Sequence, residues 1–143
     1  MPTRYVGLTM AFAAVAATAG CGLLGTEPSE PAKTSGRIMI GYKSEPTQSV
    51  TCTQVDQQLT IRAVASPGNA RVQLELGADK PSVKTVNIEN IGGLNGIAGA
   101  GNGKAEARAN GSSAYKITGT AVVSDPGHPT QTQNLPFSIE APC

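Results

Sequence analysis

The stretch Leu59-Thr60-Ile61-Arg62-Ala63 places an apolar side chain at every second position. A second stretch, Arg71-Val72-Gln73-Leu74-Glu75-Leu76, alternates in the same way. Alternation with a period of two is typical of antiparallel strands that bury one face and expose the other. Between the two stretches lies Ser66-Pro67-Gly68-Asn69, which consists of residues that favour turns. This part of the chain therefore predicts two strands joined by a turn.

The same alternation recurs from Arg37 to the end of the chain. Six further runs share it: residues 37–40, 50–53, 86–89, 104–109, 115–119 and 135–141. Turn residues separate several of these runs, and Asn110-Gly111 is the strongest hairpin signal. Run 104–109 also suits a helix by propensity, but its alanines occupy alternate positions and glycines flank it, which favours a strand. About eight strands around one core predict an all-β fold, either an antiparallel β-sandwich or a partly closed barrel.

The N-terminal segment has the features of an export signal. Residues 1–20 carry one positive charge, Arg4, followed by an apolar segment that ends in Thr18-Ala19-Gly20-Cys21. Small residues directly before a cysteine predict a lipoprotein signal peptide over residues 1–20. Cys21 would then be the lipidation site, carrying S-diacylglycerol and an N-acyl chain such as palmitate. The alternative is an ordinary secretory signal that is cleaved elsewhere, with Cys21 incidental.

A polar segment separates Cys21 from the first predicted strand. Residues 21–35 are rich in Pro, Ser, Thr, Glu and Lys, and such a segment cannot bury enough apolar area to order itself. A flexible coil of this length spans about 20 Å. We therefore expect a flexible tether over residues 21–35 and a β domain over residues 36–143. The tether hydroxyls are either O-glycosylated or bare.

Three cysteines are present, and lipidation of Cys21 leaves Cys52 and Cys143 as a pair. Because exported proteins occupy an oxidising compartment, a disulfide between them is expected, and two free buried thiols are the alternative. Strand parity places both side chains on the inner face. If Pro142 breaks the register, Cys143 lies at the rim instead.

The composition disfavours several classes of function. After Gly20, ten Lys and Arg residues face ten Asp and Glu residues, so no basic field is expected to attract nucleic acid. The single histidine, His128, lies between turn residues without a partner, and we expect no catalytic residue, metal site or cofactor. The glycine-rich stretch 92–103 lacks the spacing of a phosphate-binding loop and is expected to connect two strands. Its apolar members, Leu94, Ile97 and Ala98, would cover one end of the core or line an opening into it.

Several segments together resemble a known family. These are the cysteine motif at Cys21, Ser49-Val50-Thr51-Cys52, residues 82–86 with the glycine-rich stretch, Tyr115-Lys116-Ile117-Thr118-Gly119-Thr120-Ala121, and the terminal residues 137–143. The chain resembles the mycobacterial 19 kDa lipoprotein antigen family over nearly the whole predicted domain. The resemblance implies an acylated surface antigen anchored in the cell envelope, with an N-terminus of the type that host innate lipopeptide receptors recognise. It implies no catalytic activity.

Two hypotheses for function follow. The first is a lipoprotein attached to the extracytoplasmic face of the cell membrane, whose non-catalytic β domain serves binding or interaction. The second is a carrier that holds a lipid or another small apolar ligand. It is motivated by a core poor in aromatic residues beside a partly apolar, glycine-rich loop.

Overall fold

The computed structural model describes residues 36–143, except residues 78 and 112. The predicted signal peptide and tether, including Cys21, lie outside the described residues. Nine strands follow one another along the chain: β1 (Arg37–Ile40), β2 (Lys43–Val55), β3 (Gln58–Ala65), β4 (Asn69–Glu75), β5 (Ser82–Ile91), β6 (Leu94–Gly99), β7 (Lys104–Ala109), β8 (Ala114–Asp125) and β9 (His128–Pro142). Over the described residues, no helix is long and apolar enough to cross a membrane.

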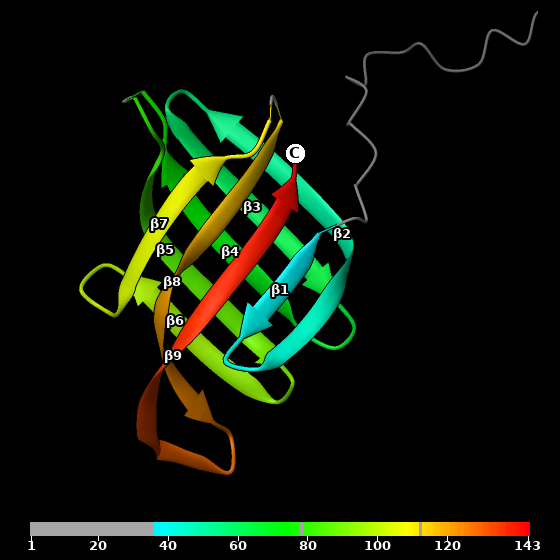
Figure 1. The fold of residues 1–143 in the computed structure, drawn as a ribbon, viewed down its shortest axis with the longest axis vertical. Coiled ribbons are helices and arrows are strands. Elements are labelled where there is room, and N and C mark those ends of the chain that lie inside the picture. Colours follow the sequence, from blue (N-terminus) through cyan, green and yellow to red (C-terminus); the bar gives the residue numbers. More distant parts are fainter. Residues whose placement is uncertain (1–35, 78, 112) are drawn as a thin grey trace, which may run out of the picture. The chain divides into compact units, whose positions relative to one another are not determined.

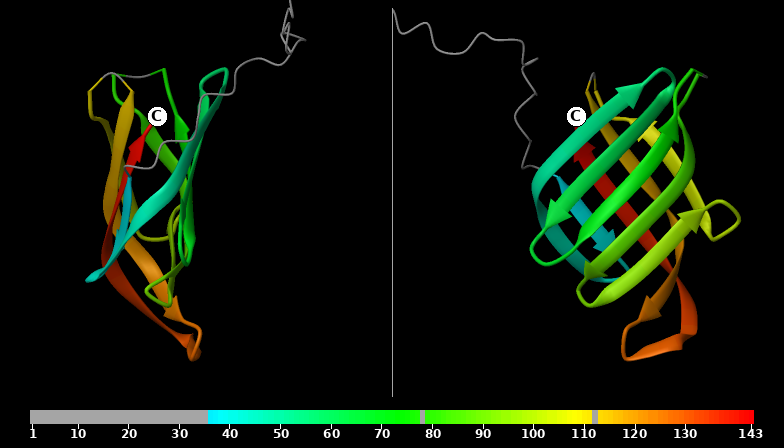
Figure 2. Two further views of the ribbon diagram at one scale, coloured as in Figure 1. Left: turned by 90° about the vertical axis from the view of Figure 1, so that its right-hand side faces the viewer. Right: turned by 180° about the vertical axis from the view of Figure 1, so that it is seen from behind.

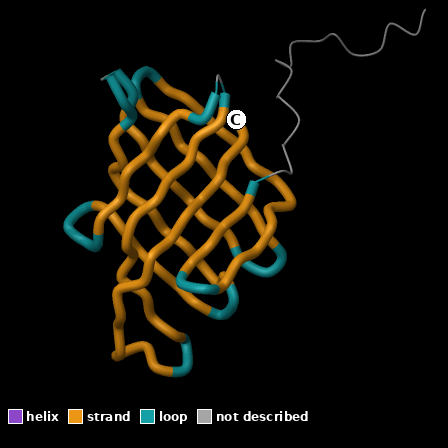
Figure 3. Tube along the Cα trace, viewed as in Figure 1, coloured by secondary structure: helices purple, strands orange, loops and turns teal. Residues whose placement is uncertain are grey.

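The strands form one antiparallel sheet that closes on itself. Their order is β6-β5-β4-β3-β2-β1-β9-β8-β7, and β6 pairs in addition with β8. This extra pairing closes eight strands into a barrel and leaves β7 as a ninth strand beside β8 (Figures 1 and 3). Seen from the side, the barrel of residues 36–143 is flattened into two layers (Figure 2, left). The predicted all-β fold is confirmed, and of the two architectures considered, a β-sandwich or a partly closed barrel, the structure has the barrel.

The core lies between the two layers and is aliphatic. Seven isoleucines from five different strands are completely buried: Ile38, Ile40, Ile61, Ile88, Ile91, Ile117 and Ile139. Phe137 is the one aromatic residue among the buried side chains of the described chain. In most strands the buried side chains occupy alternate positions, as Ile38 and Ile40 do in β1. In β2 and β5 the spacing widens once to three residues, where the register shifts. The alternation read from the sequence therefore corresponds to the inner and outer faces of the sheet.

Strand β6 lies in the glycine-rich stretch, where the sequence predicted a connection, and that prediction was wrong. Its inward positions are occupied by Gly96 and Ala98, whereas Ile97 faces outward and is 44% exposed. A Cβ atom at Gly96 would lie 2.7 Å from Cδ1 of Ile40. Glycine therefore leaves room for the Ile40 side chain beneath β6. The usual large apolar residue is missing because the Ile40 side chain of β1, a strand that does not pair with β6, fills the space.

The other local predictions at the turns are confirmed. Residues 104–109 form the strand β7, and the Asn110 N–H donates a hydrogen bond to the carbonyl of Ala114 at 2.8 Å in the following hairpin. Gly111 has a φ of 78°, which glycine adopts without strain. In the β8–β9 turn, the Gly127 N–H donates to Oδ1 of Asp125 at 2.9 Å. Both turns depend on the residue types that the sequence places there.

Candidate functional site

Strand pairing is interrupted at two seams, and the first lies between β2 and β9. The short strand β1 separates them only as far as Arg37, which pairs with Pro46 on one side and Glu140 on the other. Beyond this point β2 continues to Val55 and β9 to Pro142, and no described strand lies between them. The disulfide between Cys52 and Cys143 spans this seam, with a Cα–Cα distance of 5.7 Å.

The disulfide joins the two cysteines that the sequence analysis paired. Both residues are half-buried and pack against the core, so the bond lies at one end of the barrel and not in its centre. Cys143 directly follows β9, and its N–H donates a hydrogen bond to the carbonyl of Ser113 at 2.6 Å. The end of the chain is thereby attached both to β2 and to the β7–β8 hairpin.

The second seam lies between β5 and β7. Strand β8 shares one edge between two partners, pairing with β7 over residues 115–120 and with β6 over residues 122–124. Strand β6 in turn pairs with β5 only from Thr85 onward. A register shift opposite Gln73 and Leu74 bends β5 just before this point, as bulges do where pairing ends. The first residues of β5 therefore face β7 without a ladder of hydrogen bonds.

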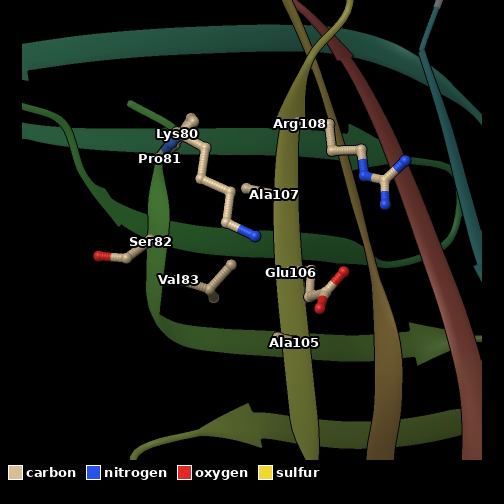
Figure 4. Close-up of a pocket in the computed structure, with 8 residues that line it drawn as sticks. All are labelled: Lys80, Pro81, Ser82, Val83, Ala105, Glu106, Ala107 and Arg108. Atoms are coloured by element: carbon tan, nitrogen blue, oxygen red, sulfur yellow. The ribbon is translucent and has the colours of Figure 1, made fainter. Parts of the chain in front are cut away.

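A hollow of about 400 Å³ occupies this seam, which we call the β5–β7 hollow. Its lining consists of the two residues before β5, the first two residues of β5 and most of β7: Lys80, Pro81, Ser82, Val83, Ala105, Glu106, Ala107 and Arg108 (Figure 4). Val83 and Ala105 are half-buried, and Ala107 is buried against the core. Lys80, Glu106 and Arg108 are exposed, and the Lys80 side chain extends along the gap between the strands (Figure 4). The hollow thus combines apolar inner residues with a charged rim, which suits a small apolar or amphipathic group.

The hollow was not predicted from the sequence, although one signal for it existed. Inward positions of β7 carry only alanine, and such small side chains leave the space next to Val83 unfilled. The apolar residues of the glycine-rich stretch do not line this hollow. Leu94 lines a separate hollow next to Tyr42, and Ile97 faces outward.

The residues considered for catalysis and metal binding are not brought together. His128 lies at the start of β9 with its side chain 69% exposed, and its Nδ1 is 3.9 Å from Oδ2 of Asp125. Neither residue lines the β5–β7 hollow. Within the part of the chain that the structure describes, no group of three or more His, Cys, Asp or Glu side chains could hold a metal ion.

The fold and the disulfide define a class: a small, closed all-β domain whose last residue is joined to β2 by a disulfide. Residues 29–143 match the model of the Mycobacterium 19 kDa lipoprotein antigen family, and the chain belongs to this family. It is 35% identical over 108 residues to lipoprotein LpqH of Mycobacterium avium, an alignment covering 74% of this chain and 66% of that protein. It is 33% identical over 108 residues to lipoprotein LpqH of Mycobacterium tuberculosis strain H37Rv, with 74% and 67% covered. The resemblance seen in the sequence is confirmed, and the matched region spans about two thirds of these relatives.

Proposed function

We propose that acyl chains on Cys21 hold this lipoprotein antigen on the extracytoplasmic face of the cell membrane, and that residues 36–143 form a non-catalytic binding domain. Membership in a family of lipoprotein antigens carries this proposal. Cys21 supports it, because this cysteine follows an apolar segment and precedes the family match by eight residues. One acyl chain gives only marginal membrane binding, whereas two or three make attachment stable. Residues 21–35 would then act as the tether.

The anchor is tested by replacing Cys21 with alanine. We expect the native protein to have an intact mass that begins at Cys21 and includes acyl chains. The variant Cys21→Ala should incorporate less than about a tenth of the labelled palmitate, because it lacks the sulfur that accepts the first acyl group. Ser29→Ala, a change within the predicted tether, is the matched control and should label like the wild type. An unacylated native mass, or equal labelling of Cys21→Ala, would contradict the anchor.

The same acylated N-terminus is proposed to be the part that host innate lipopeptide receptors recognise. Acyl chains on an exported cysteine are the chemical feature that such receptors bind, and the proposal therefore depends on the acylation of Cys21. Reporter cells should respond to the wild type and not to Cys21→Ala. A full response to the unacylated protein would place recognition in the β domain instead.

A second candidate function, a carrier of a small apolar ligand, is favoured by the β5–β7 hollow. Its volume of about 400 Å³ lies within the range of sites that bind small molecules. Val83 and the alanines of β7 supply an apolar wall, and Lys80 and Arg108 at the rim could hold a polar head group. The hollow would admit a short apolar segment and not a complete long-chain lipid.

Filling the hollow should abolish such binding. In Ala105→Leu, three additional carbon atoms project from a half-buried position of the lining. We expect the amount of co-purified apolar ligand, measured by native mass spectrometry, to fall at least about fivefold, since the ligand and the new side chain compete for one space. Ala109→Leu, at an exposed position of the same strand outside the lining, is the control. Absence of ligand from the wild type, or equal retention by both variants, would exclude the carrier function.

A further inference from the structure

Two arginines lie directly opposite each other on the outer face of the sheet. Arg62 of β3 and Arg71 of β4 are register partners, and both side chains are exposed. Directly opposite residues have Cβ atoms about 4.5–5.5 Å apart, so the two guanidinium groups can reach a common point. The strands that carry them lie side by side at the front of Figure 2 (right).

This arrangement is unfavourable in the free protein, because like charges directly opposite each other destabilise a sheet. Neither arginine forms an ion pair within the described part of the chain, where the three ion pairs involve other residues. Glu89 lies diagonally from Arg71, but its Oε1 accepts a hydrogen bond from Nδ2 of Asn87 at 3.2 Å. Within the described residues, no carboxylate therefore forms an ion pair with either guanidinium group.

Threonines complete the surroundings of the pair. Thr51 of β2 lies directly opposite Arg62 of β3. Thr51, Arg62 and Arg71 are therefore aligned side by side across three adjacent strands. Thr53 and Thr60 form the next row. These five residues line a hollow of about 370 Å³, distinct from the β5–β7 hollow, with which it shares no residue. Arginine has five N–H donors and no acceptor, and each threonine hydroxyl can donate as well.

We propose that Arg62, Arg71 and the three threonines form a binding site for a phosphate group. A carboxylate has two oxygens and one charge, so a single arginine satisfies it. A phosphate group offers three or more oxygens and up to two charges, which matches two guanidinium forks and the adjacent hydroxyls. Binding would also relieve the repulsion between the arginines. The site lies outside the proposed anchor and outside the hollow proposed for an apolar ligand, and it depends on neither.

Titration with inorganic phosphate tests the site. The full-length protein is held in a neutral detergent at low ionic strength, since salt screens exposed charges, and binding is measured by calorimetry. We expect saturable binding that weakens at least tenfold in Arg62→Gln and in Arg71→Gln. Arg71→Lys, which keeps the charge and loses the planar fork, should weaken binding about threefold or more. The matched control is Arg37→Gln, which removes an exposed arginine of β1 that does not line the proposed site. Nη1 of Arg37 donates a hydrogen bond to Oγ of Ser44 at 2.8 Å.

Thermal unfolding in the absence of phosphate separates loss of the site from loss of the fold. Removing one of two repelling charges should leave the melting temperature of the glutamine variants unchanged or raise it by a few degrees. A second titration uses neutral detergent micelles containing phosphatidic acid. Saturation by inorganic phosphate identifies a free phosphate ligand, and saturation only by the doped micelles identifies a lipid head group. The proposal is overturned if the wild type binds neither probe, or if both glutamine variants bind like the wild type.

Discussion

Replacing Cys52 and Cys143 together by alanine is expected to lower the free energy of unfolding by about 4 kcal/mol. The two residues are 91 positions apart, so the bond closes a loop that contains β3 to β9. Closing so long a loop removes much of the conformational freedom of the unfolded chain, which is the main source of stabilisation in the chain-entropy description. For a domain of this size, the loss corresponds to a fall in melting temperature of about 15 °C or more.

The folded state should also change near the disulfide. Between β2 and β9 no described strand continues beyond Arg37, and the disulfide joins the two strands in that seam. Amide hydrogen exchange in β1 and at the end of β9 should therefore accelerate more than exchange in β3 and β4. The wild type in reductant is the control, because it lacks the bond but keeps both half-buried sulfur atoms, which pack against the core. Equal melting temperatures for the oxidised wild type, the reduced wild type and the variant would contradict the stabilising role.

Much of the fold could be predicted because burial on one face requires a period of two. The run at Leu59, Ile61 and Ala63 illustrates this, since all three side chains are buried in β3 while Arg62 is exposed. The Asn110-Gly111 hairpin could be placed for a different reason, because few residues adopt the backbone conformation that such turns require. The alternation and the turn residues are both local features, so one sequence is enough to recognise them.

The seams could not be predicted, because they depend on which strands meet. The alternation of apolar and polar residues does not predict strand β6, because Gly96 faces inward and Ile97 faces outward. Glycine at position 96 leaves room for the side chain of Ile40 from a distant strand. The β5–β7 hollow arises because β8 divides one edge between two partners. The juxtaposition of Arg62 and Arg71 likewise depends on the register between β3 and β4. None of these relations is encoded in the spacing of residues along one strand.

Substituting Gly119 by alanine is expected to destabilise the protein by about 3 kcal/mol. Gly119 lies on β8 opposite Ala105 of β7. A Cβ atom there would collide with the carbonyl oxygen of Lys104 and lie 2.8 Å from Cα of Ala105. Both are backbone atoms, so no side-chain rotation relieves the collision and β7 must move away from β8. Gly127→Ala is the control, because its added Cβ would lie no closer than 3.5 Å to its nearest neighbour.

The direction in which β7 moves links this prediction to the second seam. Strand β7 is hydrogen-bonded as a ladder only to β8, and its other edge faces the β5–β7 hollow. A displacement away from β8 therefore moves Ala105 and Ala107 toward Val83 and narrows the hollow. In Gly119→Ala we expect faster amide exchange throughout β7 and, if the hollow binds an apolar ligand, weaker retention of that ligand. A melting temperature within about 2 °C of the wild type would contradict the prediction. It would show that β7 can move away from β8 with little loss of stability, and that the close contact at Gly119 does not fix the position of β7.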